Sequence, residues 1–97
     1  MYRPLPPYLT IKESSIEGLG LFAREDIPAD TNLGISHYFS KMLGKTVRTP
    51  LGGFYNYSED ANCYSLISTE FAELITQRNI KAGEEITTTY KIQPLHP

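Results

Sequence analysis

The sequence predicts a mainly β domain made of several small sheets, and three observations support this fold class. Helical periodicity is hard to find anywhere in the chain. Short segments rich in β-branched and aromatic residues recur instead, and turn-forming residues separate them. The 97 residues also favour one domain with a compact core, because so short a chain buries only about two thirds of its unfolded surface.

Short strands are expected along most of the chain, with one helical turn at Ser40 to Leu43. Residues 1–7 are expected to form a flexible Pro-rich N-terminus and residues 92–97 a C-terminal tail, around one domain at 8–91. The expected strands are YLTIKES (8–14), LGLFA (19–23), NLGISHYF (32–39), KTVRT (45–49), GFYN (53–56), CYSLIST (63–69), FAELITQ (71–77) and EITTTYKI (85–92).

Two stretches of the sequence align with each other, LFAREDIPADTNLGI (21–35) and LITQRNIKAGEEITT (74–88). The alignment matches Ile27 with Ile80. Each copy reads as a strand, a tight turn and a returning strand, with the isoleucine filling the core beneath the turn. An internal repeat explains this pattern, and so do two hairpins that merely share common hairpin chemistry.

Charge and cysteine content narrow the classes of partner and site. Nine basic and eleven acidic residues give a net charge of -2, and the basic residues are scattered, so no nucleic-acid partner is expected. The acidic pairs, such as Glu84-Glu85, suit either a basic peptide or solvated turns. Cys63 is the only cysteine, which excludes an internal disulfide and a multi-cysteine zinc site, and no metal is expected.

No stretch of the sequence approaches the roughly 20 apolar residues of a membrane span, and the N-terminus lacks the apolar run of a signal peptide. An intracellular protein without a membrane partner is therefore expected. Nucleophilic catalysis by Cys63 is disfavoured, because the chain contains only two histidines, His37 and His96, and the second lies in the Pro-rich tail.

The segment GLGLFA (18–23) fits the spacing of a dinucleotide-binding fingerprint. That fingerprint requires a following helix, and Pro28 arrives before two helical turns could form, so a Rossmann fold is rejected. Two glycines flanking Leu19 would still let a ligand lie against the backbone, although a plain glycine turn gives the same pattern.

Three motifs in a fixed order carry a resemblance to a known family: EGLGLFA (17–23), GFYNYSEDANC (53–63) and IKAGEEITTTY (80–90). Together they resemble the SET domain, the family of protein lysine methyltransferases that use S-adenosylmethionine. In its shortness the chain is most similar to the minimal viral SET proteins. The resemblance runs from Leu9 to Tyr90.

The resemblance implies a β-clip-like fold of small sheets with a C-terminal pseudoknot. In this fold the segment NYSEDAN (56–62) threads beneath a loop formed by the C-terminal stretch and lies beside the cofactor. Its polar side chains would satisfy irregular buried backbone that no sheet ladder pairs.

The resemblance also implies the cofactor-binding residues. Gly18, Leu19 and Gly20 would pass S-adenosylmethionine along bare backbone. Asn56 and the backbone of Tyr57 would hold its adenine and amino-acid parts.

By the same resemblance, Tyr90 is the catalytic residue at the end of a narrow lysine channel. Tyr38 and Phe54 would supply aromatic walls of that channel if they lie near it. The implied partner is a lysine-containing protein or peptide, with a histone tail as the family's usual substrate. Because few residues follow Tyr90, a homodimer is expected to complete the channel.

The sequence departs from the family's motifs at several positions. Tyr57 stands where the family usually has histidine, and Ala61 where it has proline. Two functions therefore follow from the sequence. One is a lysine methyltransferase, and the other is a catalytically inactive SET-like binding or assembly module.

Overall fold

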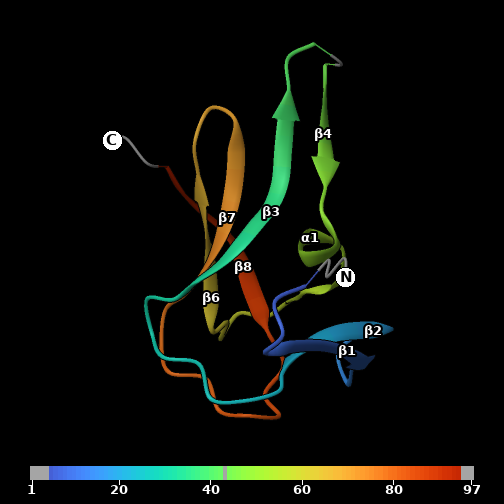
Figure 1. The fold of residues 1–97 in the computed structure, drawn as a ribbon, viewed down its shortest axis with the longest axis vertical. Coiled ribbons are helices and arrows are strands. Elements are labelled where there is room, and N and C mark those ends of the chain that lie inside the picture. Colours follow the sequence, from blue (N-terminus) through green and yellow to red (C-terminus); the bar gives the residue numbers. More distant parts are fainter. Residues whose placement is uncertain (1–4, 43, 95–97) are drawn as a thin grey trace.

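The computed structural model describes residues 5–42 and 44–94, without the side chains of residues 90–94, and its strands form two sheets (Figure 1). Strands β1 (Leu9–Glu13) and β2 (Leu19–Ala23) pair as a small antiparallel sheet. The larger sheet has the strand order β4-β3-β7-β6-β8-β5. Its strands are β3 (Asn32–Ser40), β4 (Lys45–Arg48), β5 (Asn56–Tyr57), β6 (Cys63–Ile67), β7 (Phe71–Thr76) and β8 (Thr87–Pro94).

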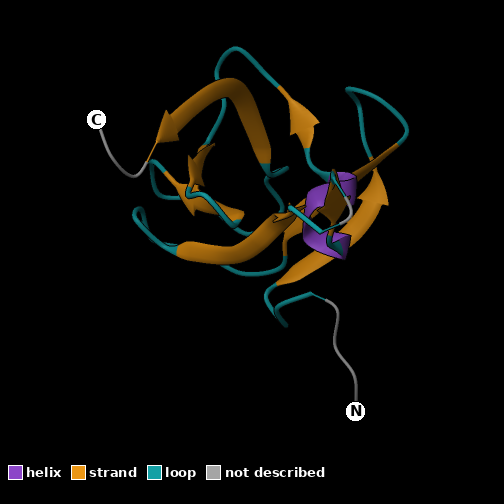
Figure 2. Cartoon of the chain, turned by 90° about the horizontal axis from the view of Figure 1, so that it is seen from above, coloured by secondary structure: helices purple, strands orange, loops and turns teal. Residues whose placement is uncertain are grey.

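The expected mainly β fold is confirmed, and the position of the helical turn is wrong. Residues 41 and 42 lie in the turn of the β3–β4 hairpin, and Leu43 lies outside the described residues. The helix is α1 (Pro50–Phe54), which takes part of the expected strand at 53–56. Thr49 caps this helix, because its hydroxyl accepts a hydrogen bond from the Gly52 N–H at 3.3 Å, and Pro50 supplies a φ suited to the first helical position. Seen from above, α1 lies beside the strands on one side of the molecule (Figure 2).

The two aligned stretches meet each other in the structure. Ile27 and Ile80 form an antiparallel bridge in which each backbone N–H donates to the other residue's carbonyl, at 2.7 and 2.8 Å. Both side chains are buried. The two loops that carry them run side by side at the lower left of Figure 1. This mutual pairing relates the two aligned stretches by an approximate two-fold arrangement, as an internal repeat predicts.

Other hydrogen bonds obey the same symmetry. The bond from the Asp30 N–H to the Thr76 carbonyl has its equivalent in the bond from the Gly83 N–H to the Ala23 carbonyl, and both measure 2.8 Å. Asp30 and Gly83 occupy equivalent turn positions and have positive φ, 61° and 92°. The pairs surround a core in which the largest fully buried apolar side chains come from both copies: Leu21, Leu74, Ile80 and Ile86.

A pseudoknot forms where the C-terminal strand passes between two neighbours. Strand β8 lies between β5 and β6 and is parallel to both, while residues 58–62 connect β5 directly to β6. The side chain of Asn62, only 2% exposed, donates to the Glu85 carbonyl at 2.8 Å and accepts from the Thr87 N–H at 2.9 Å. Asn62 therefore pairs backbone groups that no sheet ladder reaches.

The proposed domain boundaries fall in ordered structure. Leu5 packs against the core, and β8 continues to Pro94. Residues 1–4 and 95–97 lie outside the described residues, so the boundaries at 7 and 92 stay predictions. Within the described part of the chain, no helix has the length and apolar character needed to cross a membrane.

We predict that Asn62→Ala destabilises the fold by roughly 2–4 kcal/mol, because it leaves the Glu85 carbonyl and the Thr87 N–H unpaired in a buried position. Urea unfolding measures this change. Asn32→Ala is the matched control, because Asn32 also makes two side-chain hydrogen bonds but is exposed. Equal losses in the two variants would contradict the role given to Asn62.

Candidate functional site

Three segments far apart in the sequence meet at the carboxylate of Glu85. The Ser14 hydroxyl, from the turn after β1, lies 2.8 and 2.7 Å from its two oxygens. The Asn56 side-chain amide, from β5, donates to the carboxylate at 2.7 Å. Each of the three motifs therefore contributes to this cluster directly or through a neighbouring residue. We call Ser14, Asn56 and Glu85 the carboxylate cluster.

The carboxylate cluster fixes the orientation of the Asn56 amide. Besides Glu85, the Asn56 Nδ2 lies 3.1 Å from the Ser14 hydroxyl and 3.2 Å from the Glu17 carbonyl. A reversed amide would bring its oxygen against a carboxylate and a carbonyl, which is unfavourable. The Oδ1 atom accepts no hydrogen bond from any described residue. It is therefore held in place as an acceptor next to the glycine loop.

The glycine loop, residues 18–20, presents bare backbone beside this amide. Gly18 has a φ of 49°, and no described atom lies within 4 Å of the position that a Cβ would take there. A Cβ at Gly20 would instead collide with the Glu85 carboxylate and lie 3.0 Å from the Ser14 Cβ. Gly18 thus leaves space for a ligand, whereas Gly20 leaves space for the carboxylate cluster. Large apolar side chains are exposed around the loop: Ile16, Leu19 and Tyr57.

A hollow lies among residues of strands β3, β4, β6, β7 and β8. It has a volume of about 260 Å³. Thr88 lines it and is the register partner of Tyr57, so one residue pair connects the hollow with the glycine-loop site. The described lining residues include no Asp or Glu; they are His37, Phe39, Thr46, Tyr55, Ser65, Ile67, Ala72, Thr88 and Thr89. We call this space the neutral pocket.

Histidine 37 adds no positive charge to the neutral pocket near pH 7. Burial and the nearby positive charge of Arg48 lower the pKa of His37 from its ordinary value. Its Nδ1 lies 3.0 Å from the Ser36 hydroxyl, and its ring meets the Tyr55 ring edge to face with 6.4 Å between centroids. The pocket therefore combines an apolar lining with uncharged polar groups.

Some of the predicted site residues lie close together in the structure. Gly18, Leu19, Gly20, Asn56 and Tyr57 lie in one region, as the contacts above show. Tyr90 follows Thr89 in β8 and so belongs to the strand that lines the neutral pocket, but its side chain lies outside the described residues.

Neither predicted channel residue is among the described residues that line the neutral pocket. Tyr38 lines a different hollow, and Phe54 is partly buried against the core. A contact of either residue with a substrate lysine stays a prediction. The described residues contain no group of three His, Cys, Asp or Glu side chains that could hold a metal ion. Burial raises the pKa of the Cys63 thiol to about 12 and keeps it protonated.

The sequence-based reasoning missed the carboxylate cluster. The sequence alone predicts that Glu84 and Glu85 form an acidic pair, which suits either binding of a basic peptide or a solvated turn. In the structure Glu85 instead bonds to Ser14 and Asn56, whereas Glu84 stays a turn residue and accepts a hydrogen bond from the Lys81 N–H at 2.9 Å. The only indication in the sequence was Ser14, which lies near the glycine loop and whose hydroxyl could donate a hydrogen bond to an acceptor far away in the chain.

We predict that Gly20→Ala destabilises the protein by about 1–3 kcal/mol, because the new methyl group must displace the Glu85 carboxylate. Thermal unfolding monitored by circular dichroism measures the change. Gly53→Ala is the control, since that glycine has open space around its Cβ position and lies in the exposed part of α1. A Gly20→Ala protein as stable as Gly53→Ala would disprove the packing argument.

Comparisons with known proteins agree with this geometry. No curated protein sequence matches the chain. A Plasmodium falciparum protein, proposed to be a histone methyltransferase, has a similar structure with a TM-score of 0.72 at 22% identity, covering 90% of this chain and 96% of that chain. The methyltransferase domain of human PR domain-containing protein 2 gives a TM-score of 0.73 at 16% identity, covering 90% of this chain and 79% of that one.

A third similar structure is that of the Chaetomium thermophilum Polycomb Repressive Complex 2 bound to S-adenosylmethionine. Its TM-score is 0.67 at 20% identity, and the match covers 84% of this chain and 15% of that chain. At these identities the structures establish a shared fold. The family model of the SET domain matches residues 36–91, which is more than half of the chain. This protein therefore belongs to the SET-domain family.

Proposed function

We propose that this protein is an S-adenosylmethionine-dependent methyltransferase that modifies a lysine side chain of a protein. Membership of the SET-domain family supports this function. The observation that carries it is the juxtaposition of two features: an oriented amide beside an open glycine loop, and a neutral pocket one residue pair away. A methyltransferase needs such an arrangement, because the methyl donor and the amine that accepts the methyl group must be held in line.

The glycine-loop site fits S-adenosylmethionine. When bound, this cofactor supplies a methyl group made electrophilic by a sulfonium. Gly18 leaves its backbone open to the ligand, and the Asn56 Oδ1 is an acceptor for an amino group of the cofactor. Leu19 and Tyr57, both exposed, offer apolar surface that a bound cofactor would cover.

The neutral pocket fits the lysine. The nucleophile must be the neutral amine, and a pocket with no described Asp or Glu gives an ammonium ion no counter-charge. The neutral His37 neither repels a cation nor supplies one. The lining residues therefore favour loss of the lysine proton before methyl transfer. These residues would hold the neutral amine as the acceptor of the methyl group that a bound cofactor would supply, with the electron pair of the broken C–S bond left on sulfur.

Tyr90 is the proposed catalytic residue. Its backbone directly follows the pocket residue Thr89 in β8, which supports this role. A phenolic oxygen there would accept weak C–H···O contacts from the polarised methyl group and hold it in line with the amine.

Substrate and assembly state complete the proposal. We assign a histone tail as the substrate class, in line with the description of the Plasmodium falciparum neighbour. We also propose an intracellular homodimer, in which a second copy covers the exposed Ile16 next to the cofactor site and excludes water from the site. Sedimentation of the purified protein with and without cofactor reports on this assembly.

The first prediction concerns cofactor binding. We expect S-adenosylmethionine to bind with one site per chain in a calorimetric titration, and we expect Asn56→Ala and Gly20→Val to abolish that binding. Asn56→Ala removes the oriented acceptor, and Gly20→Val disrupts the carboxylate cluster. Gly53→Ala serves as the control that binds normally. Absence of wild-type binding at millimolar cofactor would contradict the proposal and favour a SET-like binding or assembly module.

The second prediction concerns the chemical step. Tyr90→Phe should lower methyl transfer to a lysine peptide by about 100-fold or more while leaving cofactor affinity unchanged, because only the hydroxyl contacts the moving methyl group. Transfer of radiolabelled methyl groups measures the rate. Tyr64→Phe, on the neighbouring strand β6 but outside the neutral pocket, is the control with full activity. Unchanged turnover in Tyr90→Phe would remove Tyr90 from the mechanism.

A further inference from the structure

Among the described residues that line the neutral pocket, His37 is the only one whose side chain carries a nitrogen base. A lysine side chain has an ordinary pKa of about 10.4, so at pH 7 only about one lysine in 2,500 is the neutral amine that can accept a methyl group. Loss of the lysine proton therefore needs an acceptor. The described lining contains no Asp or Glu, which leaves His37 as the candidate.

Hydrogen bonds on one side of the His37 ring assign its tautomer. The Ser36 hydroxyl is fully buried and donates its single proton to the Ala72 carbonyl at 3.3 Å. Its oxygen can then only accept from the His37 Nδ1, which lies 3.0 Å away, so Nδ1 carries the ring proton. The neutral ring consequently has its lone pair on Nε2, the ring nitrogen further from the backbone. Nε2 makes no hydrogen bond with a described residue.

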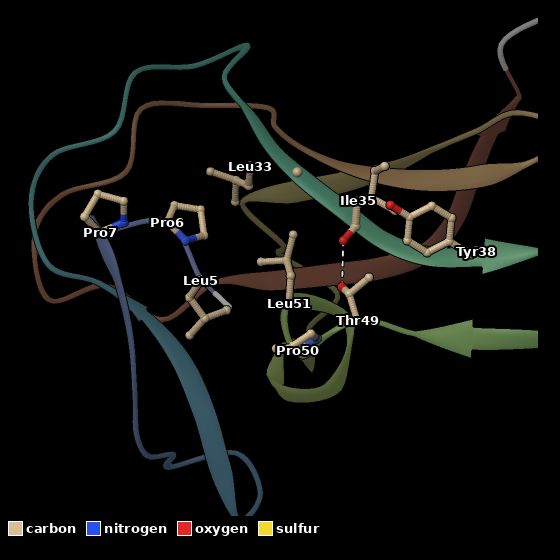
Figure 3. Close-up of a pocket in the computed structure, with 10 residues that line it drawn as sticks. Leu5, Pro6, Pro7, Leu33, Ile35, Tyr38, Thr49, Pro50 and Leu51 are labelled. Atoms are coloured by element: carbon tan, nitrogen blue, oxygen red, sulfur yellow. Dashed lines mark hydrogen bonds between the residues drawn. The ribbon is translucent and has the colours of Figure 1, made fainter. Parts of the chain in front are cut away.

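The start of α1 holds the backbone that carries this ring. The Thr49 hydroxyl donates to the Ile35 carbonyl at 2.6 Å, as Figure 3 shows, and the Thr49 N–H donates to the Ser36 carbonyl at 3.0 Å. A Cβ at Gly52 would collide with the same Ser36 carbonyl and lie 3.2 Å from the His37 Cε1. The helix therefore packs directly against the imidazole and restricts its rotation.

The two hollows beside β3 differ in what they offer a lysine. A hollow of about 680 Å³, which we call the large hollow, lies between β3 and the start of α1 (Figure 3). Ile35 and Tyr38 line it, together with Leu33 and Leu51. None of its described lining residues is an acid or a nitrogen base, whereas the neutral pocket contains the His37 ring. Only the neutral pocket is therefore equipped to take a proton from an ammonium group.

Few charged or titratable groups surround the His37 ring. Its cross-strand partner on β4 is Arg48, which is exposed, and the Tyr55 ring meets it edge to face. Its partner on β7 is Ala72, the described pocket residues of β6 and β8 are uncharged, and α1 contains no titratable residue. Burial and the positive charge of Arg48 lower the pKa of His37, so the ring is neutral at pH 7 and readily returns a proton to water.

We propose that His37 is the general base of the methyl transfer and that its Nε2 takes the proton from the substrate ammonium group. This inference rests on the proposed function. An N–H bond of the lysine breaks, its electron pair stays on the amine nitrogen, and the proton forms a new N–H bond with Nε2. Because His37 is partly exposed, the imidazolium then releases this proton to water. The neutral amine is left as the acceptor of the methyl group that a bound cofactor supplies.

The pH dependence of methyl transfer tests this role. General-base catalysis typically contributes at least about 100-fold, so His37→Gln should slow transfer to a lysine peptide by about 100-fold at pH 7 while cofactor affinity stays unchanged. The wild-type rate should be level between about pH 7 and pH 9. The variant's rate should rise about tenfold per pH unit over that range, because it depends on the free amine alone.

Thr46→Ser is the matched control for the pH profile. Thr46 also lines the neutral pocket but has no basic group, so this variant should change the rate by the same factor at pH 7 and at pH 9. A His37→Gln profile that runs parallel to the wild-type profile would overturn the proposal.

Nitrogen-15 NMR of the histidine side chains in the wild-type protein tests the tautomer without any turnover. We expect the neutral His37 ring to carry its proton on Nδ1, with the His37→Gln spectrum used for assignment. Ser36→Ala should shift the population toward the Nε2-protonated form, because Nδ1 loses its acceptor. A wild-type ring protonated on Nε2 would overturn the proposal even if the protein is an active methyltransferase.

Failure of the proposed function would look different from failure of this inference. A wild-type protein that binds no cofactor and methylates no lysine peptide at any pH would overturn both, since His37 would then have no reaction to serve. Cofactor binding and methyl transfer that are equally fast in wild type and His37→Gln at pH 7 would overturn the inference alone.

Discussion

The candidate site depends on the position of Glu85. Its carboxylate receives the Ser14 hydroxyl and the Asn56 amide, while its backbone carbonyl receives the Asn62 amide. The two asparagines of the knot therefore hold opposite ends of one residue. A glycine at position 20 follows from the same contact, because the carboxylate occupies the place of its Cβ. Fold and site are consequently specified by the same interactions, and neither can be altered alone.

The site occurs only once because the two copies of the repeat differ outside their symmetric core. The repeat aligns Glu85 with Asn32, which is exposed and bonds to Glu73 on a neighbouring strand. The symmetric hydrogen bonds around Ile27 and Ile80 build the same frame for both positions. Only the second copy continues into a strand enclosed by the knot, so only Glu85 meets Asn56. The symmetric core gives stability, and the departure from symmetry creates the site.

The sequence predicted local features well and non-local ones poorly. Strand positions followed from β-branched runs and turn residues, and the family resemblance implied that the glycine loop and Asn56 belong to one site. The helix at Pro50 was missed because two glycines weaken any helical signal, although the Thr49 cap and Pro50 fix it. Glu85 looked like a solvated turn residue, because its partners lie far away in the chain. The neutral pocket likewise depends on strand register, which no local pattern contains.

A bulge in β3 explains how one strand can serve two surfaces. The pairing of β3 with β7 shifts between Ile35 and His37, which places the irregularity at the fully buried Ser36. In a regular strand, Ile35 and His37 would share a face. After the shift, Ile35 and Tyr38 line the large hollow, whereas His37 lines the neutral pocket. The extra residue thus turns Ile35 and Tyr38 to one side of the hairpin and His37 to the other, which keeps the large hollow separate from the neutral pocket.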